Sequence, residues 1–268
     1  MDRQFKNYTY TSSEVDHGYG SNIHILSDFF LLSHLAQLCA EGTKQPMINE
    51  LIHTLYLSLL KIVVNKEFPK KISAIRTRMA SSHKEGVFKG PLLDAEQSVV
   101  SVNLARAGTL PSHICYTALN YFINPDIVRQ DHISIARTTD TQDKVTGSEV
   151  AGHKIGGDID GSIVLFPDPM GATGGTLVEA VDLYKKRGRA AKYIALHCIV
   201  TPEYIKKIQS RHPDLVVYAI RLDRGLSPTD VLDSVPGVHW EREKGLNDKH
   251  YIVPGGGGFG EIMNNAYV

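Results

Sequence analysis

From about residue 98 to residue 222, short apolar runs rich in β-branched residues alternate with segments of helical period. We predict strands at residues 98–104, 133–136, 162–166, 193–200 and 215–220. We predict helices at residues 111–122, 177–186 and 202–211. Continuous apolar strands separated by single helices are typical of βαβ units, whose parallel sheet is covered on both faces. The chain is therefore predicted to be an α/β protein that binds ligands at the carboxyl ends of its strands.

Two further helices are predicted before this region. The first is indicated by apolar residues at helical spacing, namely Ile25, Phe29, Leu32 and Ala36. The second has a longer apolar stripe made of Ile48, Leu51, Ile52, Leu55, Leu59, Ile62 and Val63. Pro69 fits a stop after it. The two helices either pack together or form a subunit contact, and residues 1–21 are predicted to be a loosely held polar arm.

Two stretches are predicted to be loops. Residues 138–160 are rich in Thr, Asp, Gly and Lys and have no apolar period. A loop of that length inside a compact domain is usually an active-site lid or disordered. Residues 227–244 form the second, with two prolines and the only tryptophan, Trp240.

Composition narrows the function classes. The 268 residues carry 29 Lys plus Arg and 29 Asp plus Glu, a balance that argues against a general nucleic-acid or membrane binder. Three cysteines without a CxxC pattern form neither a disulfide framework nor a zinc site. No secretory signal is visible, and the apolar stretch from Leu51 to Val64 is expected to be too short to span a bilayer. We expect a soluble, cytoplasmic protein.

The segment from Ile163 to Thr176 carries the clearest chemistry. An apolar strand is followed by Asp168, by a loop of small residues with paired glycines, and by a helix. Thr176 and Glu179 have the spacing of a capping box, which predicts that the helix starts at Thr176. Converging N–H groups and the helix dipole would make this turn a phosphate cradle, with Asp168 placed for sugar hydroxyls. The alternative is a tight βα turn in which the glycines serve geometry alone.

This segment resembles the phosphoribosyl-diphosphate (PRPP) motif of type I phosphoribosyltransferases, and its Asp-Pro-Met and Ala-Thr-Gly-Gly-Thr runs are similar to the uracil phosphoribosyltransferase subfamily. The resemblance covers residues 22–260 in order. Residues 104–108 resemble the pyrophosphate loop, residues 135–137 the start of the mobile loop, and residues 212–223 and 251–255 the last strands and the uracil-facing hood. It implies a single domain from residue 22 to residue 268, with a helical pair at 22–69, a sheet core at 98–222, and an insertion and hood at 223–268.

The resemblance implies transfer of the phosphoribosyl group of PRPP to uracil, giving UMP and pyrophosphate, with Mg²⁺ bound together with PRPP. Asp168, Arg106 and Arg137 are the implied catalytic residues, and no protein residue is assigned to the metal. The implied PRPP-binding residues are Ala107, Gly108, Asp168, Met170, Gly171, Ala172, Thr173, Gly174, Gly175 and Thr176. A solvated surface role is the competing interpretation of both arginines. The family analogy and the two N-terminal helices also suggest a homodimer or higher homo-oligomer.

The expected base pocket departs from the family. The implied substrate-binding residues are Tyr251, Ile252, Val253, Gly255, Gly257, Gly258, Phe259, Gly260 and Glu261. The family usually reads Pro-Gly-Leu-Gly-Asp-Ala-Gly-Asp here, whereas this chain has Gly258 and Phe259 in place of the first Asp and the Ala, and Glu261 in place of the second Asp. Phe259 is expected to stack on a base or to fill the pocket. Two alternatives therefore stay open: a transferase for another nucleobase, and a non-catalytic PRPP or nucleotide sensor.

Two other patterns are set aside. Gly255, Gly257 and Gly260 satisfy GxGxxG, but too little chain follows for the helix and acid of a dinucleotide site. His197 and Cys198 are adjacent on a predicted strand and point to opposite faces, so we expect buried structural positions for both.

Overall fold

The computed structural model describes residues 8–139 and 145–267, with side chains up to residue 134 and from residue 151. Its centre is one sheet with the strand order β1-β10-β9-β7-β4-β5-β6, and the short β8 also pairs with β9. The strands are β1 (Ile23–Ile25), β4 (Val99–Ala105), β5 (Val128–Thr139), β6 (Val145–Lys154), β7 (Ile163–Pro167), β8 (Met170–Gly171), β9 (Lys192–Val200) and β10 (Val216–Leu222). All neighbours are parallel except β5 and β6. The predicted α/β architecture is confirmed.

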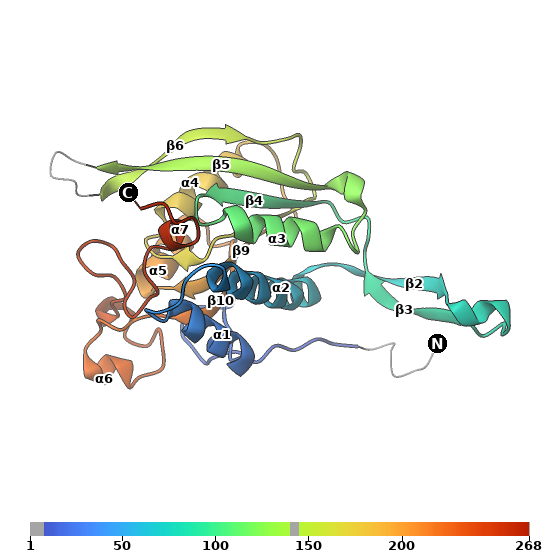
Figure 1. Cartoon of the computed structure of the whole chain (residues 1–268), viewed down its shortest axis with the longest axis horizontal. Coiled ribbons are helices and arrows are strands. Elements are labelled where there is room, and N and C mark those ends of the chain that lie inside the picture. Colours follow the sequence, from blue (N-terminus) through green and yellow to red (C-terminus); the bar gives the residue numbers. More distant parts are fainter. Residues whose placement is uncertain (1–7, 140–144, 268) are drawn as a thin grey trace.

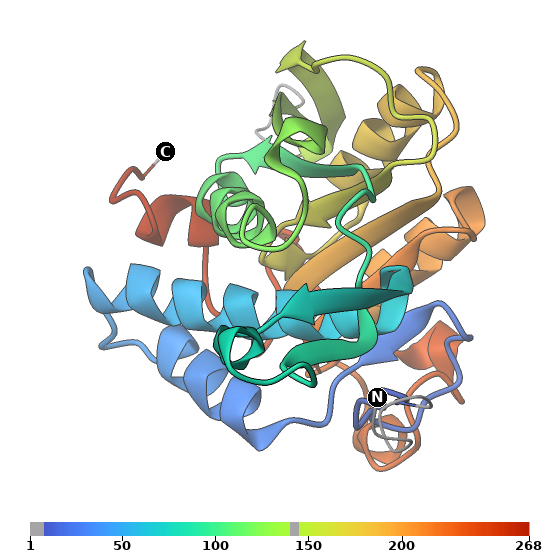
Figure 2. The same ribbon diagram turned by 90° about the vertical axis from the view of Figure 1, so that its right-hand side faces the viewer.

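Helices cover both faces of this sheet (Figures 1 and 2). One face carries α1 (Phe29–Cys39), α2 (Met47–Glu67), α3 (Thr109–Leu119) and the short α7 (Phe259–Ile262), and the other carries α4 (Gly175–Lys185) and α5 (Pro202–Arg211). Successive residues of β7 alternate between the two cores, with Leu165 in the first and Phe166 in the second. Burial on both faces explains why the central strands are continuous apolar runs.

The first predicted helix is wrong at its start and in its buried face. Ile25 ends strand β1, which pairs in parallel with β10. The helix begins at Phe29 because Asp28 accepts a hydrogen bond from the Leu31 N–H and caps it. Phe29 is 85% exposed, while the buried positions are Leu31, Leu35 and Leu38. The segment is apolar on nearly all sides, so its spacing alone does not define which face packs.

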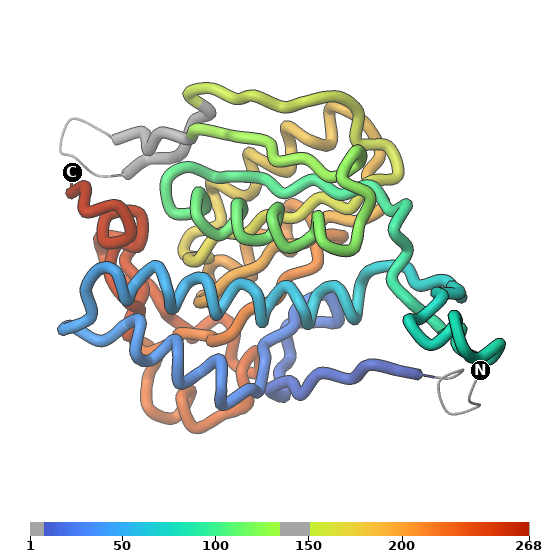
Figure 3. Tube along the Cα trace, turned by 45° about the vertical axis from the view of Figure 1, so that its right-hand side comes forward, coloured from blue at the N-terminus to red at the C-terminus, as the bar shows by residue number. Residues whose placement is uncertain are grey.

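The second helix is confirmed, since every residue of its predicted stripe is buried. Helices α1 and α2 lie side by side along one face (Figure 3). At 21 residues α2 is long and apolar enough to cross a membrane, so the expectation that this stretch is too short is wrong. More than half of its most apolar window is buried in the protein, which is how a core helix meets the same length and hydropathy.

The expected loop at residues 138–160 is only partly a loop. Strand β6 covers Val145–Lys154 and forms an antiparallel pair with β5, while residues 140–144 lie outside the described chain. An edge strand with one polar side lacks the apolar run that predicts a buried strand, which explains the error. The hairpin of β2 (Lys70–Arg76) and β3 (Val87–Leu93), joined through a short 3₁₀ turn at Arg78–Ser81, was also not predicted. It projects from the body of the molecule (Figure 1).

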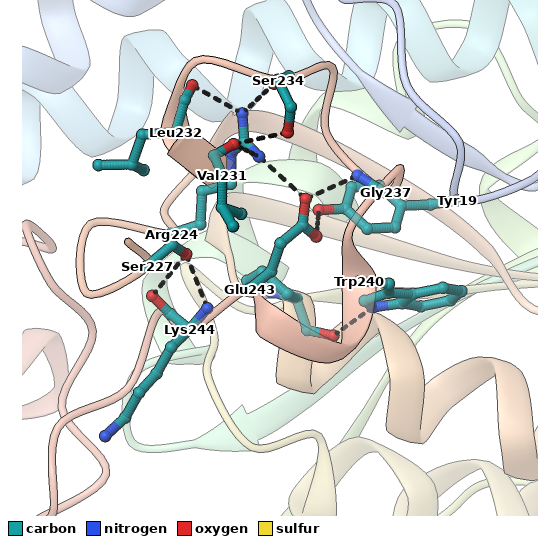
Figure 4. A network of polar contacts seen from close by, with 11 residues as sticks. Tyr19, Arg224, Ser227, Val231, Leu232, Ser234, Gly237, Trp240, Glu243 and Lys244 are labelled. Atoms are coloured by element: carbon teal, nitrogen blue, oxygen red, sulfur yellow. Dashed lines mark hydrogen bonds and ion pairs between the residues drawn. The ribbon is translucent and has the colours of Figure 1, made fainter. Parts of the chain in front are cut away.

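The segment at residues 227–244 has only short helical pieces, Thr229–Leu232 (α6) and Trp240–Arg242, as the loop prediction allows. A buried ion pair fastens it: Arg224 Nη1 donates to Glu243 Oε1 at 2.9 Å (Figure 4). Glu243 also accepts from the Gly237 N–H and from the Tyr19 hydroxyl. Because Tyr19 precedes β1, the network joins this segment to the N-terminal arm.

Candidate functional site

The phosphate loop, which we define as residues 168–176, connects β7 to α4. Helix α4 begins at Gly175, and its cap residue is Gly174, which has a φ of +77° and no side-chain cap. The predicted capping box with a start at Thr176 is therefore wrong, because a left-handed glycine, rather than a threonine side chain, turns the chain into the helix. The predicted order of strand, acid, small-residue loop and helix is confirmed.

The loop is tied to β9 through its carbonyl groups. The Pro169 carbonyl accepts from the N–H groups of Cys198 and Ile199, both at 3.0 Å. The Gly171 carbonyl accepts from the Thr201 N–H at 3.1 Å, and Thr201 Oγ1 donates to the Ala172 carbonyl at 2.7 Å. The loop is thus fixed from the side of the sheet.

Three N–H groups in the second half of this loop have no acceptor among the described residues. Among the residues that the structure describes, the N–H groups of Thr173, Gly174 and Thr176 donate to no protein acceptor. Thr173 is exposed and Thr176 half-buried. Free amides at a helix N-terminus are suited to an anion such as a phosphate.

Asp168 stands at the end of β7, at the entrance to this loop. Its carboxylate is half-buried, and Oδ1 accepts from the Met170 N–H at 3.3 Å. Removal from water raises the pKa of this carboxyl from 3.8 to about 7, because burial disfavours the charged form. Asp168 is therefore an acceptor whose charge varies near neutral pH.

The predicted pyrophosphate loop lies next to the phosphate loop because β4 and β7 are neighbours. The Ala105–Arg106 peptide bond is cis. A Cβ on Gly108 would lie 2.8 Å from the Leu104 carbonyl oxygen and 3.0 Å from that of Pro167, so only glycine fits between the two strand ends.

The two predicted arginines are placed differently. Arg106 Nη1 donates to the Ala266 carbonyl at 3.0 Å. Arg137 lies in β5, paired with Ser148, and its side chain is outside the described part of the chain.

An ion pair at the end of β10 is hydrogen-bonded to the C-terminal hood, residues 251–261. At the end of β10, Arg221 Nε donates to Asp223 Oδ1 at 2.6 Å, and Asp223 is buried. The Gly255 N–H donates to Asp223 Oδ2 at 2.8 Å, and Arg221 Nη2 donates to the Gly255 carbonyl at 3.0 Å. Burial acts against the charged form of Arg221, but the Asp223 contact prevails and raises the pKa of the guanidinium.

Of the two roles expected of Phe259, stacking on a base does not agree with its position. Its side chain is 1% exposed and belongs to the core under α7, so its ring offers no face to a base. It packs beside Gly256, where a Cβ would lie 2.7 Å from both the Phe259 ring and Cys39 Sγ. The substitution therefore fills the core beneath the hood, where sequence alone cannot separate a buried aromatic from a stacking one.

The other predicted hood residues lie in three different surroundings. Gly260 lies against the pyrophosphate loop, with its Cβ position 3.6 Å from the Ala107 nitrogen, and the Glu261 carboxylate folds back over Gly258. Tyr251 is 38% exposed, and its N–H donates to Asn247 at 2.9 Å. The remaining members, Ile252, Val253, Gly255 and Gly257, form the turn that the ion pair holds.

Sequence reasoning missed the ion pair that positions the hood. Two opposite charges two residues apart at the end of an apolar strand, as at Arg221 and Asp223, are the signal in the sequence that indicates such a pair. Residues two apart on a strand lie on the same face and can pair.

The side chains near the site determine whether it can bind a metal ion such as Mg²⁺. Within residues 8–139 and 145–267, no group of three or more His, Cys, Asp or Glu side chains is arranged to hold an ion. Mg²⁺ keeps several waters and is commonly bound by one or two carboxylates together with substrate phosphates. A site with Asp168 at its entrance fits an ion that arrives on a diphosphate better than a resident one.

Comparisons with known proteins agree with this geometry. The family model described as uracil phosphoribosyltransferase matches residues 25–239. A uracil phosphoribosyltransferase of Streptococcus equi subsp. zooepidemicus is 28% identical over 235 residues, 87% of this chain and 93% of that protein. One of Dictyoglomus thermophilum is 29% identical over 241 residues, 89% of this chain and 97% of that protein. Among solved structures, the AQ2163 protein from Aquifex aeolicus shares the fold, with a TM-score of 0.70, 23% identity, and coverage of 92% of this chain and 99% of its own.

Proposed function

Because the chain belongs to the uracil phosphoribosyltransferase family and is a phosphoribosyltransferase, we propose that its acceptor is uracil and that it forms UMP and pyrophosphate from PRPP. In this reaction the bond between ribose C1 and the pyrophosphate oxygen breaks, a bond from C1 to uracil N1 forms, and the N1 proton is released to solvent. Pyrophosphate leaves with the bonding electron pair. The reaction needs positioning and charge stabilisation more than covalent catalysis.

The free amides of the phosphate loop are the observation that carries the proposal. Thr173, Gly174 and Thr176 offer N–H groups to the 5′-phosphate, and Asp168 accepts from the ribose hydroxyls. The cradle also includes Met170, Gly171, Ala172 and Gly175. We propose that a sugar phosphate bound there has its C1 toward the loop of Ala107 and Gly108, because that loop follows the neighbouring strand β4.

Arg106 and Arg137 are proposed to hold the leaving pyrophosphate. Arg106 now donates to the Ala266 carbonyl, a neutral partner that an anion would replace with a stronger, charge-assisted bond. Mg²⁺ bound with PRPP would neutralise charge on the pyrophosphate, and Asp168 offers a carboxylate at the entrance to the phosphate loop. The chain's own part is to bind, orient and shield the diphosphate from water.

The hood is proposed to read uracil through backbone groups. The Asp223 and Arg221 contacts occupy the N–H and the carbonyl of Gly255 and fix the turn. Among the described residues, the backbone groups of Gly256 and Gly257 have no protein partner and are the ones that we propose contact the base. Since Phe259 is buried, this substitution by itself gives no ground for a different base. Uracil therefore stays the favoured acceptor.

The deciding experiment is a screen of free nucleobases for pyrophosphate release with PRPP and Mg²⁺. We expect release with uracil and little with purines or cytosine. Release with another base would reassign the acceptor, and UMP or PRPP binding without release with any base would indicate a sensor. In the Asp168→Asn variant, uracil-dependent release should fall while the protein stays folded.

A homodimer or higher homo-oligomer in the cytoplasm is proposed as the state of the protein. Exposed apolar side chains on α1 and on the β2–β3 hairpin support self-association, among them Phe29, Phe30, Ile72 and Ile75. Light scattering of the purified protein at micromolar concentration tests it, and a monomer mass would contradict it.

A further inference from the structure

A buried histidine and tyrosine lie directly beneath the phosphate loop. His197 on β9 is 1% exposed and Tyr204 on α5 is 1% exposed. His197 Nδ1 lies 2.5 Å from the Asp168 carbonyl oxygen, and its Nε2 lies 2.6 Å from the Tyr204 hydroxyl. The sequence pattern indicated only a core role for His197, yet its ring contacts the main chain of the acid at the entrance to the site.

The partners of His197 determine which ring nitrogen carries the hydrogen and which accepts one. A carbonyl oxygen can only accept, so Nδ1 of His197 carries the hydrogen and donates to Asp168. Burial lowers the pKa of the imidazole to about 4, so the ring is neutral and Nε2 is an acceptor. The Tyr204 hydroxyl must then donate to Nε2. A directed chain of hydrogen bonds runs from α5 through β9 to the backbone of Asp168.

The Tyr204 ring also fills the space under the loop. A Cβ on Gly171 would lie 3.2 Å from this ring and 2.9 Å from Val200 Cγ1, and a Cβ on Gly174 would lie 3.4 Å from it. Thr201 Oγ1 accepts from the Tyr204 N–H at 3.0 Å while donating to the Ala172 carbonyl. The absence of a side chain at Gly171 is therefore required by packing beneath the loop.

We propose that His197 and Tyr204 are positioning residues that hold Asp168 and the phosphate loop in the geometry that binds a ribose 5-phosphate. The proposal rests on the proposed function, because it assigns the loop to the phosphoribosyl group. Neither side chain touches the substrate. Their effect passes through the Asp168 carbonyl and through the ring packed under Gly171 and Gly174.

The test measures binding of ribose 5-phosphate by calorimetry, a probe that needs neither base nor turnover. Tyr204→Phe keeps the ring but leaves His197 Nε2 without a donor, and we expect about fivefold weaker binding. The KM for PRPP should rise by a similar factor while the KM for uracil changes little. The matched control is Tyr218→Phe, which removes another buried hydroxyl, bonded to Glu67 far from the loop, and should leave ribose 5-phosphate binding unchanged.

A second pair of variants separates the two bonds of the histidine. The Asn side chain reaches about as far as Nδ1, so His197→Asn keeps a donor for the Asp168 carbonyl. The Gln side chain reaches about as far as Nε2, so His197→Gln keeps only the partner of Tyr204. We expect His197→Asn to bind ribose 5-phosphate more tightly than His197→Gln.

The wild-type protein gives a readout independent of any variant. Nitrogen-15 NMR of the histidine ring should show His197 as the Nδ1–H tautomer at pH 7, and the Nε2–H tautomer would overturn the proposal. Equal ribose 5-phosphate affinity in wild type and Tyr204→Phe would also overturn it. A wild type that binds no ribose 5-phosphate and releases no pyrophosphate would instead refute the proposed function, so the two failures are distinguishable.

Discussion

The Asp223 carboxylate accepts the N–H of Gly255 at 2.8 Å, and this bond joins the end of β10 to a turn 32 residues further along the chain. Arg221 completes a closed ring by contacting both Asp223 and the Gly255 carbonyl. The turn that is proposed to face the base is thereby held through its main chain. Side-chain identity in the turn can then vary while its course is kept.

Asp223→Ala should weaken base binding more than PRPP binding. The substitution frees the Gly255 turn and leaves Arg221 half-buried without its partner, so we expect a loss of about 3 kcal/mol in the free energy of unfolding. The KM for uracil should rise about tenfold, since the turn no longer has a fixed position. Steady-state kinetics and urea denaturation measure the two effects. Asp230→Asn, at an exposed ion pair with Arg242, is the control and should change neither.

The pH profile should report Asp168. Because its pKa is raised to about 7, the carboxylate is mostly protonated at pH 6 and mostly ionised at pH 8. The ionised form is the better acceptor for ribose hydroxyls, so kcat/KM for PRPP should rise about tenfold between these values. Asp168→Asn should remove this limb along with most of the activity. A wild-type profile that is flat from pH 6 to pH 8 would contradict the role.

The same shift predicts a sign for stability. Between pH 4 and pH 7 the folded protein keeps a proton on Asp168 that the unfolded chain has lost, so this group's contribution to stability is lost as pH rises through that window. His197, whose pKa is lowered to about 4, acts in the opposite direction between pH 4 and pH 6.5. The difference between wild type and Asp168→Asn in urea denaturation isolates the first group. That difference should move against the wild type as pH rises.

Gly171→Ala tests the packing beneath the loop. The new methyl group would meet Val200 and the Tyr204 ring, so the loop must shift, at a cost of about 1–3 kcal/mol in stability. We expect a clear rise in the KM for PRPP, measured at saturating uracil. Gly42→Ala is the matched control, because nothing lies within 4 Å of its Cβ position. Unchanged PRPP binding in Gly171→Ala would show that the space tolerates a side chain.

Glu243→Gln should separate stability from chemistry. The change leaves the Arg224 charge buried without a counter-charge, and we expect a loss of about 3–5 kcal/mol in the free energy of unfolding. Kinetic constants of the folded fraction should stay near those of wild type, because the network joins residues 227–244 to the N-terminal arm rather than to the phosphate loop. Glu241→Gln, at an exposed pair with Lys206, should cost less than about 0.5 kcal/mol. Calorimetric unfolding and initial rates provide both measurements.

The central βα units could be predicted because burial on both faces leaves an unmistakable apolar run. Helix α5 was placed at its exact bounds, since Thr201 and Pro202 are strong start signals. The β2–β3 hairpin escaped prediction because its residues are mostly exposed and carry no period-two pattern. Strand β1 was not predicted because its three residues form a strand only by pairing with β10. Tertiary contacts decide such elements, and a single sequence does not contain them.

The residues of the candidate site also divide into those that the sequence predicts and those that only the fold brings together. Asp168 and the loop after it follow the chain order, so the sequence reveals them together. His197, Tyr204, Arg221 and Asp223 come from two later strand–turn units and meet the loop or the hood only when the sheet forms. Their local sequence is that of ordinary core and strand-end residues. What the sequence lacks here is register, the fact that the end of β9 lies beside the end of β7.

Because β9 anchors the phosphate loop, the loop cannot be grafted onto another protein by itself. A peptide or graft of residues 163–185 would carry the whole recognisable phosphate-binding sequence and still lack the partners of its carbonyl groups, which reside at Cys198, Ile199 and Thr201. The smallest portable unit is therefore two consecutive βα repeats, and a fragment cut between them should behave as a flexible glycine-rich turn.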